Sequence, residues 1–237
     1  MQKPGKLFLL PSSLGESPIS RVIPQYNQEI ILHIRHFYVE SEKSARQFLR
    51  KSGFKIDFSE VELILLNEHI IASKTDLSGL LKPLLEGYDA AILSDAGCPA
   101  VADPGAEIVK IAHQKHIQVI PLVGPSSILL ALMASGMNGQ GFTFLGYLPK
   151  EKNERIRKIK LAETDANQKK QTQIFIETPY RNQHVFNDIL SVCKNDTLLC
   201  LALDISTNSE SIVTKRVDEW KRQIPEIGKR QAVFLIY

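Results

Sequence analysis

The chain has 237 residues, of which 29 are Lys or Arg and 26 are Asp or Glu, and its formal net charge is +3. This length suits one large domain or two modest ones, and a hydrophobic content of 43% allows a sizeable core and argues against disorder. The mildly basic balance permits an anionic partner without requiring one. Three cysteines without metal-ligand spacing predict no metal site and indicate a reduced compartment. Because no stretch has the length of a transmembrane helix, we expect a soluble cytoplasmic protein with no membrane partner.

Short apolar runs alternate with amphipathic segments along the chain. The predicted strands are 6–10, 35–39, 63–67, 90–94, 118–123, 142–146, 173–177, 198–203, 211–216 and 232–237. The predicted helices are 41–51, 76–86, 104–115, 126–135, 150–163 and 180–193. This alternation predicts an α/β fold with mainly parallel sheets, and the last strands, which have no helices between them, predict antiparallel pairs.

The stretch PLVGP, residues 121–125, lies at mid-chain with a proline at each end and a glycine beside the second. Such a stretch is typical of a boundary between domains. It predicts two α/β domains, 1–122 and 123–237, and the cleft between two such domains is a natural place for a ligand.

Three loops rich in Gly, Pro and Ser follow predicted strands: PSSLG at 11–15, SDAGCPAVADPG at 94–105 and GPSS at 124–127. In open α/β sheets, ligands bind outside the carboxyl ends of the strands. Glycine allows the backbone to approach a ligand closely, and the carboxylate of Asp95 can accept hydrogen bonds from a ribose or an ammonium group. Any one of these loops alone is also typical of an ordinary turn. The chain contains neither the dinucleotide-binding nor the phosphate-binding glycine motif.

These loops resemble those of the tetrapyrrole methylase superfamily, which are class III methyltransferases. The segment SDAGCPAVADPG is similar to SDAGTPxxSDPG, and PLVGPSSILLALMASG is similar to PxPGPSAxxAALxxSG. Further along, FTFLGYLPKEKNER resembles FxFxGFLPRKxxxR, IFIETPYR resembles FYESPHR, and LALDIS stands where the family has ARELT. The branch most similar to this chain is that of the small-subunit ribosomal RNA methyltransferases I, which methylate a cytidine ribose 2′-hydroxyl in 16S RNA. The resemblance runs in order along nearly the whole chain.

The resemblance implies two α/β domains with S-adenosylmethionine in a cleft between them, usually in a homodimer. It also implies a set of cofactor-binding residues at the ends of strands in both domains. These are Leu14, Asp95, Cys98, Ser126, Ser127, Ile176, Glu177, Ala202 and Asp204.

The departures from the family pattern lie mainly in motifs on the substrate side. The family's AEDTRxTR reads here VESEKSAR, so that Ser41 and Lys43 replace an aspartate and an arginine, while Glu40 and Arg46 remain. The family's HEHN reads Asn-Glu-His-Ile at 67–70, and Leu203 stands in place of an arginine. Because lysine does not contact phosphate in the bidentate way of arginine, these changes affect the predicted substrate more than the predicted cofactor.

Methyl transfer from a sulfonium requires alignment and exclusion of water, and a weak hydroxyl nucleophile is helped by a base or a positive field. The candidate catalytic residues are Glu40, Glu68, His69 and Arg46. For His69 a structural role is the competing interpretation, and for the two glutamates it is a solvated ion pair.

A basic run at 150–160 on a predicted helix is typical either of a solvated face, with Glu151 and Glu154 four residues before Arg155 and Lys158, or of a surface that tracks RNA phosphates. Tyr180 and Arg181 are placed either to hold a nucleotide or to begin a helix and cap an acid.

The leading prediction is a methyltransferase that uses S-adenosylmethionine and acts on ribosomal or related RNA, with RNA or the small ribosomal subunit as its partner. Two alternatives stay open. One is a methyltransferase of a small molecule such as a tetrapyrrole, and the other is a family member that binds RNA or the cofactor without catalysis.

Overall fold

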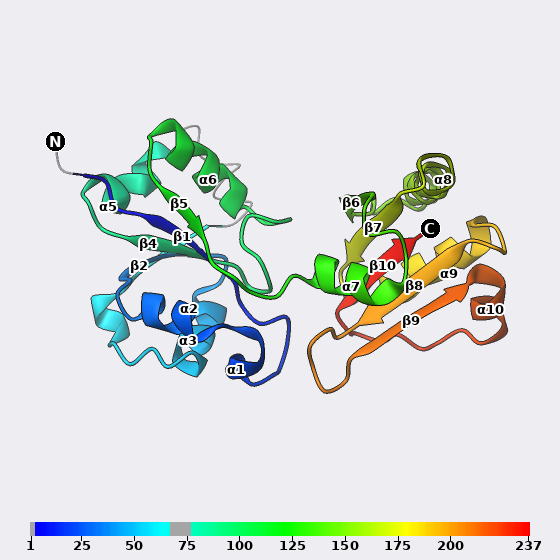
Figure 1. Cartoon of the computed structure of the whole chain (residues 1–237), viewed down its shortest axis with the longest axis horizontal. Helices are drawn as coiled ribbons and strands as arrows, with labels where there is room; N and C mark the ends of the chain where they lie inside the picture. Colours follow the sequence, from blue (N-terminus) through cyan, green and yellow to red (C-terminus); the bar gives the residue numbers. More distant parts are fainter. Residues whose placement is uncertain (1–2, 67–76) are drawn as a thin grey trace. The chain divides into compact units, whose positions relative to one another are not determined.

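The computed structural model describes residues 3–66 and 77–237. The chain forms two compact units, Met1–Ser126 and Ser127–Tyr237, each with its own five-stranded sheet and its own helices (Figure 1). The prediction of an α/β fold with two α/β domains is confirmed. No helix within the described ranges is long and apolar enough to cross a membrane.

The sheet of the first unit is parallel throughout and has the strand order β3-β2-β4-β1-β5. Its strands are β1 Leu7–Leu10, β2 His36–Val39, β3 Glu62–Leu65, β4 Ala90–Leu93 and β5 Val119–Pro121. The helices are α1 Ile19–Val22, α2 Gln25–Ile31, α3 Glu42–Lys51, α5 Lys82–Leu85 and α6 Gly105–Gln114. The central strand β4 is buried at all four positions, as expected of a strand covered on both faces.

The alternation of side chains along β4 divides the core of the first unit into two layers. Ala91 and Leu93 belong to a cluster with Phe48 and other residues of α1, α2 and α3. Ala90 and Ile92 belong to a second cluster, which includes Ile108 and other residues of α5 and α6. The sheet is therefore held rigidly from both sides, and its strand ends are fixed platforms for the loops that follow them.

The sheet of the second unit has the order β6-β7-β10-β8-β9, with β6 and β7 parallel and the other pairs antiparallel. Its strands are β6 Phe142–Tyr147, β7 Thr172–Glu177, β8 Leu198–Leu203, β9 Ser211–Arg216 and β10 Ala232–Ile236. The helices are α7 Ser127–Ser135, α8 Lys152–Lys169, α9 Asn182–Val192 and α10 Val217–Arg222. The predicted antiparallel pairing of the late strands is confirmed.

Some element predictions were wrong in extent. The predicted helix 150–163 runs from Lys152 to Lys169, where Lys170 takes the left-handed conformation with φ 53° and ends it. In the described part of the predicted helix 76–86, a 3-10 turn at Ser78–Leu81 precedes a single α-helical turn, α5. The short helices α1, α2 and α10 were not predicted, because four to seven residues carry too little periodicity.

Candidate functional site

The three loops expected to bind a ligand follow β4, β1 and β5, which are neighbours in the first sheet, and they contact one another. The backbone amide of Ser12 donates to the carbonyl of Gly97 at 3.0 Å, which joins the first loop to the second. The thiol of Cys98 lies 3.5 Å from the carbonyl of Pro125, which joins the second loop to the third. The loops therefore form one assembly at the carboxyl edge of the sheet.

Glycine is required at two places in this assembly. At Gly97, φ is +79°, and an added Cβ would lie 3.0 Å from the side chain of Leu14. At Gly124, an added Cβ would lie 2.3 Å from Cβ of Pro11. The absence of a side chain at these positions allows the first loop to pack directly against the other two.

Asp103 organises the second loop from within. Both its carboxylate oxygens lie 2.9 Å from the backbone amide of Ala100, and one of them accepts from the amide of Gly105 at 2.7 Å. Ala100 and Ala102 take left-handed conformations with φ 64° and 57°, which are unfavourable for residues with a Cβ. Burial raises the pKa of Asp103, and the two backbone donors oppose that rise without cancelling it. This carboxylate thus holds a strained loop in one shape.

Glu40 follows β2 and ties the second loop to the neighbouring strand. Its Oε1 accepts a hydrogen bond from the backbone amide of Asp95 at 3.0 Å and lies 3.3 Å from the hydroxyl of Ser94. Burial, together with the negative charge of Glu40, raises the pKa of Asp95, and a hydrogen bond from Ser44 opposes the rise. The structure therefore brings Glu40 and Asp95 together, as a candidate catalytic residue and a candidate cofactor-binding residue.

Arg46, another candidate catalytic residue, is not part of this group. Arg46 lies on α3, where its guanidinium pairs with Glu42 at 3.1 Å and packs over the ring of Phe58 at 4.9 Å. Glu68 and His69 lie outside the described residues. Ser41, which replaces the family's aspartate, accepts a hydrogen bond from the amide of Ser44 and begins α3 as its N-cap.

The first and third loops hold the remaining predicted contacts of the first unit. Leu14 is half-buried against Gly97, and Ser126 is half-buried at the end of the third loop, directly before Ser127, the first residue of α7. Burial raises the pKa of the Cys98 thiol, so it is protonated at neutral pH and is not a nucleophile there.

Two residues that hold or line the loops were not predicted. The side-chain amide of Asn27, on α2, donates to the carbonyl of Val123 at 2.8 Å and fixes the chain before the third loop. The hydroxyl of Ser12 is buried, and no hydrogen-bond partner for it exists among the residues that the structure describes. A serine inside the first glycine-rich loop was the sequence signal for it.

In the second unit the predicted residues lie in register on both sides of β10. Val233 pairs with Ile176 on one side and with Ala202 on the other, so these two side chains lie on the same face of the sheet. Ala202 is fully buried and Ile176 is partly exposed.

Asp204 directly follows β8 and is held in place there by three hydrogen bonds. Its carboxylate accepts from Arg230 at 2.6 Å, from Ser209 at 3.0 Å and from the amide of Gln231 at 3.1 Å. Burial raises the pKa of Asp204, but these three hydrogen bonds lower it by more. The pKa of this carboxyl therefore lies below its ordinary value. Asp204 therefore stabilises the end of β8 as an ionised carboxylate.

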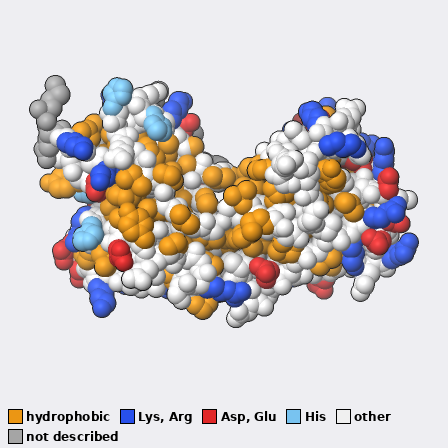
Figure 2. Space-filling view, viewed as in Figure 1, with side chains coloured by type: hydrophobic (Ala, Val, Ile, Leu, Met, Phe, Trp, Pro, Cys, Tyr) orange, Lys and Arg blue, Asp and Glu red, His pale blue; other side chains and the backbone are white. Residues whose placement is uncertain are grey.

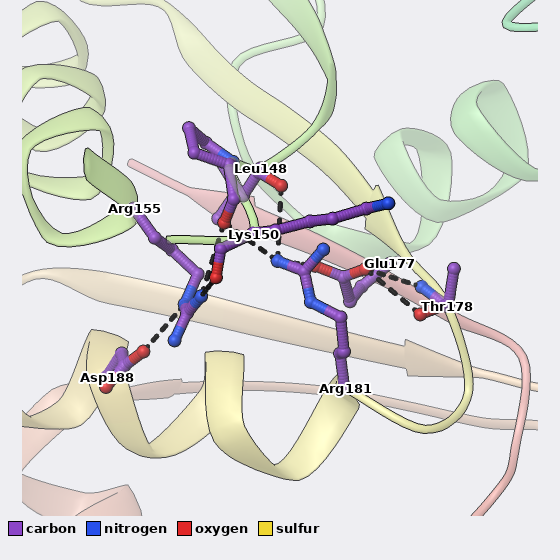
Figure 3. A network of polar contacts seen from close by, with 8 residues as sticks. Leu148, Lys150, Arg155, Glu177, Thr178, Arg181 and Asp188 are labelled. Atoms are coloured by element: carbon purple, nitrogen blue, oxygen red, sulfur yellow. Dashed lines mark hydrogen bonds and ion pairs between the residues drawn. The ribbon is translucent and has the colours of Figure 1, made fainter. Parts of the chain in front are cut away.

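Glu177 anchors a polar network at the end of β7 (Figure 3). Its side chain is fully buried, accepts from the amide of Thr178 at 2.7 Å and pairs with Arg181 at 3.1 Å. Arg181 also donates to the carbonyls of Leu148 and Pro149, at 3.2 and 2.8 Å. Of the two interpretations of Arg181, the structure supports the one in which it pairs with an acid.

Arg155 holds the same loop from the other side, and the prediction that it belongs to an exposed basic face was wrong. Its guanidinium is buried, pairs with Asp188 at 2.7 Å and donates to the carbonyls of Pro149 and Lys150, at 3.2 and 2.6 Å (Figure 3). Other basic side chains of α8 are exposed, among them Lys152, Arg157 and Lys160, and Figure 2 shows Lys and Arg gathered over this helix.

Comparison with known proteins places the chain in a class. The chain is 30% identical over 234 residues to the ribosomal RNA small subunit methyltransferase I of Vibrio cholerae, a match that covers 98% of this chain and 76% of that protein. It is 27% identical over 235 residues to the protein of the same name from Escherichia coli O157:H7, covering 98% of this chain and 77% of that one. The match to the relative from Halalkalibacterium halodurans is 32% identical over 156 residues, covering 66% of this chain and 53% of the relative. No protein-family model matches the chain.

The fold, the loop assembly and these relatives define the chain as a methyltransferase. It belongs to the family of ribosomal RNA small subunit methyltransferase I. The match spans about half the length of the Halalkalibacterium relative and about three quarters of the other two.

Proposed function

We propose that this protein transfers the methyl group of S-adenosylmethionine to RNA of the small ribosomal subunit, at a ribose 2′-hydroxyl. The observation that carries the proposal is the match to relatives of that name along 98% of the chain. The predicted homodimer and cytoplasmic location belong to the same proposal.

The loop assembly of the first unit fits this cofactor. Gly97 and Gly124 let the first loop pack directly against the other two, and the buried hydroxyl of Ser12 has hydrogen-bonding capacity to offer. Asp95 adds a carboxylate for a ribose or ammonium group. When bound there, S-adenosylmethionine would supply a methyl carbon activated by a sulfonium sulfur.

The residues of the chain then have orienting roles. Glu40 and Asp103 fix the second loop, and Leu14 and Cys98 supply apolar contact, so that water is excluded from the reacting atoms. Glu40 also remains the candidate base for the ribose hydroxyl. Because its Oε1 accepts from the amide of Asp95, the other carboxylate oxygen would take this role. Ile176, Glu177, Ala202 and Asp204 stay predictions as further cofactor contacts.

The test is calorimetric titration of the purified protein with S-adenosylmethionine, followed by labelled-methyl transfer to small ribosomal subunits that lack the modification. Saturable binding that is lost in Asp95→Ala, with transfer to the subunits, supports the proposal. Binding without transfer to any RNA would favour a small-molecule acceptor, for which the replacement of family arginines by Lys43 and Leu203 is the motivating observation.

A further inference from the structure

Tyr180 is an aromatic side chain held in the open at the carboxyl end of β7. Its exposed fraction is 75%, the highest among the tyrosines of the described residues. The ring is therefore accessible to a ligand at a strand end, where α/β proteins bind ligands.

The backbone around Tyr180 is fixed by partly buried hydrogen bonds on both sides. Before it, the amide and hydroxyl of Thr178 bond the buried carboxylate of Glu177. After it, the amide of Arg181 donates to the carbonyl of Thr178 at 2.9 Å, and its guanidinium is bound to Glu177 and to two carbonyls of the next loop. The ring is thus presented by a rigid turn, which reduces the entropy lost on binding.

Two lysines stand beside this turn. The ammonium group of Lys229 lies 5.0 Å from the centre of the Tyr180 ring. Lys150 belongs to the loop whose carbonyls Arg181 and Arg155 hold, and its side chain extends past the guanidinium of Arg181 in the view of Figure 3. Both lysines are exposed, and neither takes part in an ion pair within the part of the chain that the structure describes. By contrast, the neighbouring Arg181 and Arg230 are paired with Glu177 and Asp204.

We propose that Tyr180, Lys229 and Lys150 form a nucleotide subsite, in which an unstacked base of single-stranded RNA lies on the Tyr180 ring and the lysines contact its flanking phosphates. The inference rests on the proposed function, since it takes RNA to be the substrate. Stacking on an aromatic ring tolerates any base, so the subsite contributes affinity and position and leaves sequence recognition to other contacts. Arg181 acts in it only by positioning the turn.

The stacking test uses single-stranded RNA of about ten nucleotides with one 2-aminopurine, whose fluorescence is quenched when it stacks. We compare the wild type with Tyr180→Phe, which keeps the ring, and Tyr180→Ala, which removes it. Tyr26→Ala is the matched control, because Tyr26 on α2 is 58% exposed. Tyr180→Phe and Tyr26→Ala are expected to bind and quench as the wild type does. Tyr180→Ala is expected to lose the quenching and to bind about 10-fold more weakly.

The phosphate contact is tested by salt dependence. Lys229→Gln is expected to make the negative slope of log K against log[salt] shallower by about 0.7, the value for one phosphate contact on a single strand. The control is Lys115→Gln, which alters an exposed lysine at the end of α6 in the first unit and is expected to leave the slope unchanged.

Calorimetry with S-adenosylmethionine on each variant separates this subsite from the proposed function. Cofactor binding is expected to be unchanged in Tyr180→Ala, which also shows that the variant is folded. Equal RNA affinity and quenching in Tyr180→Ala and the wild type overturn the subsite, and so does a wild type that binds no single-stranded RNA. In either case, methyl transfer to small subunits by the same wild-type preparation decides whether the proposed function stands.

Discussion

The carboxylate of Glu40 accepts a hydrogen bond from the backbone amide of Asp95, with 3.0 Å between Oε1 and N, although 55 residues separate the two in sequence. The bond is possible because Glu40 and Ser94 directly follow Val39 and Leu93, which pair in the parallel ladder of β2 and β4. Glu40, in the VESEKSAR segment, therefore fixes the backbone position from which the side chain of Asp95 extends. This contact makes Glu40 a positioning residue for the second loop, whatever its part in proton transfer.

Glu40→Ala is expected to weaken the binding of S-adenosylmethionine by about 10-fold, because one hydrogen bond to a charged acceptor is lost from the loop. Glu40→Gln keeps an oxygen acceptor and should retain most of the affinity. Calorimetry measures both, with the exposed Glu60→Ala as control. If Glu40→Gln binds the cofactor normally but transfers no methyl group, Glu40 also acts as a base; equal affinity in Glu40→Ala and the wild type would contradict the positioning role.

The carboxylates of Asp95 and Asp204 should affect stability in opposite directions as pH changes. Burial and the charge of Glu40 raise the pKa of Asp95, so the stability it contributes is present below its unfolded pKa and is lost as pH rises through the folded one. Arg230 and its neighbours leave the pKa of Asp204 lowered, so its contribution is present above the unfolded pKa and is lost as pH falls through the folded one.

At neutral pH, Asp95→Asn should therefore be at least as stable as the wild type, whereas Asp204→Asn should be less stable. Thermal unfolding at several pH values measures this, and carboxyl NMR titration reports the two pKa values directly. The assignment of Asp95 fails if its pKa lies below that of Asp204.

Gly124→Ala should separate the first and third loops, because the new Cβ would stand 2.3 Å from Cβ of Pro11, far inside contact distance. Neither backbone nor proline ring can relieve such an overlap without a shift, so we expect a loss of about 1–3 kcal/mol in the free energy of unfolding and weaker cofactor binding. Gly139→Ala is the matched control, since an added Cβ there meets nothing within 4 Å. Unfolding by urea and calorimetry compare the two, and similar effects would argue against the packing explanation.

The sequence predicted the sheet strands and the three loops well, because buried strands and glycine-rich turns leave local patterns. It could not show that Asp103 caps Ala100 and Gly105 or that Glu40 bonds the second loop, since hydrogen-bond partners depend on which strands are neighbours. Asn27 was missed for the same reason, as its partner Val123 lies 96 residues away.

Arg155 shows how a local pattern can mislead. It sits in a run of basic residues, four positions after Glu151, and this spacing is typical of an exposed helix pair. In the structure the side chain turns to α9, where Asp188 is its partner. The sequence holds no local sign of a contact across 33 residues, whereas the exposure of Arg157, two positions on, agrees with the predicted solvated face.

The last prediction concerns this buried pair. Arg155→Ala should destabilise the second unit by about 3–5 kcal/mol, because it leaves the carboxylate of Asp188 buried without a partner and frees the carbonyls of Pro149 and Lys150. Arg157→Ala, an exposed arginine of the same helix, should change stability by less than about 0.5 kcal/mol. Chemical denaturation monitored at Trp220, which lies in the core of this unit, measures both.

Replacing both members of the pair, in Arg155→Leu with Asp188→Leu, should restore much of the loss, since apolar groups replace a buried ion pair at little cost when they pack well. A loss in Arg157→Ala as large as that in Arg155→Ala would mean that charge along α8, and not the buried contact, sets the stability.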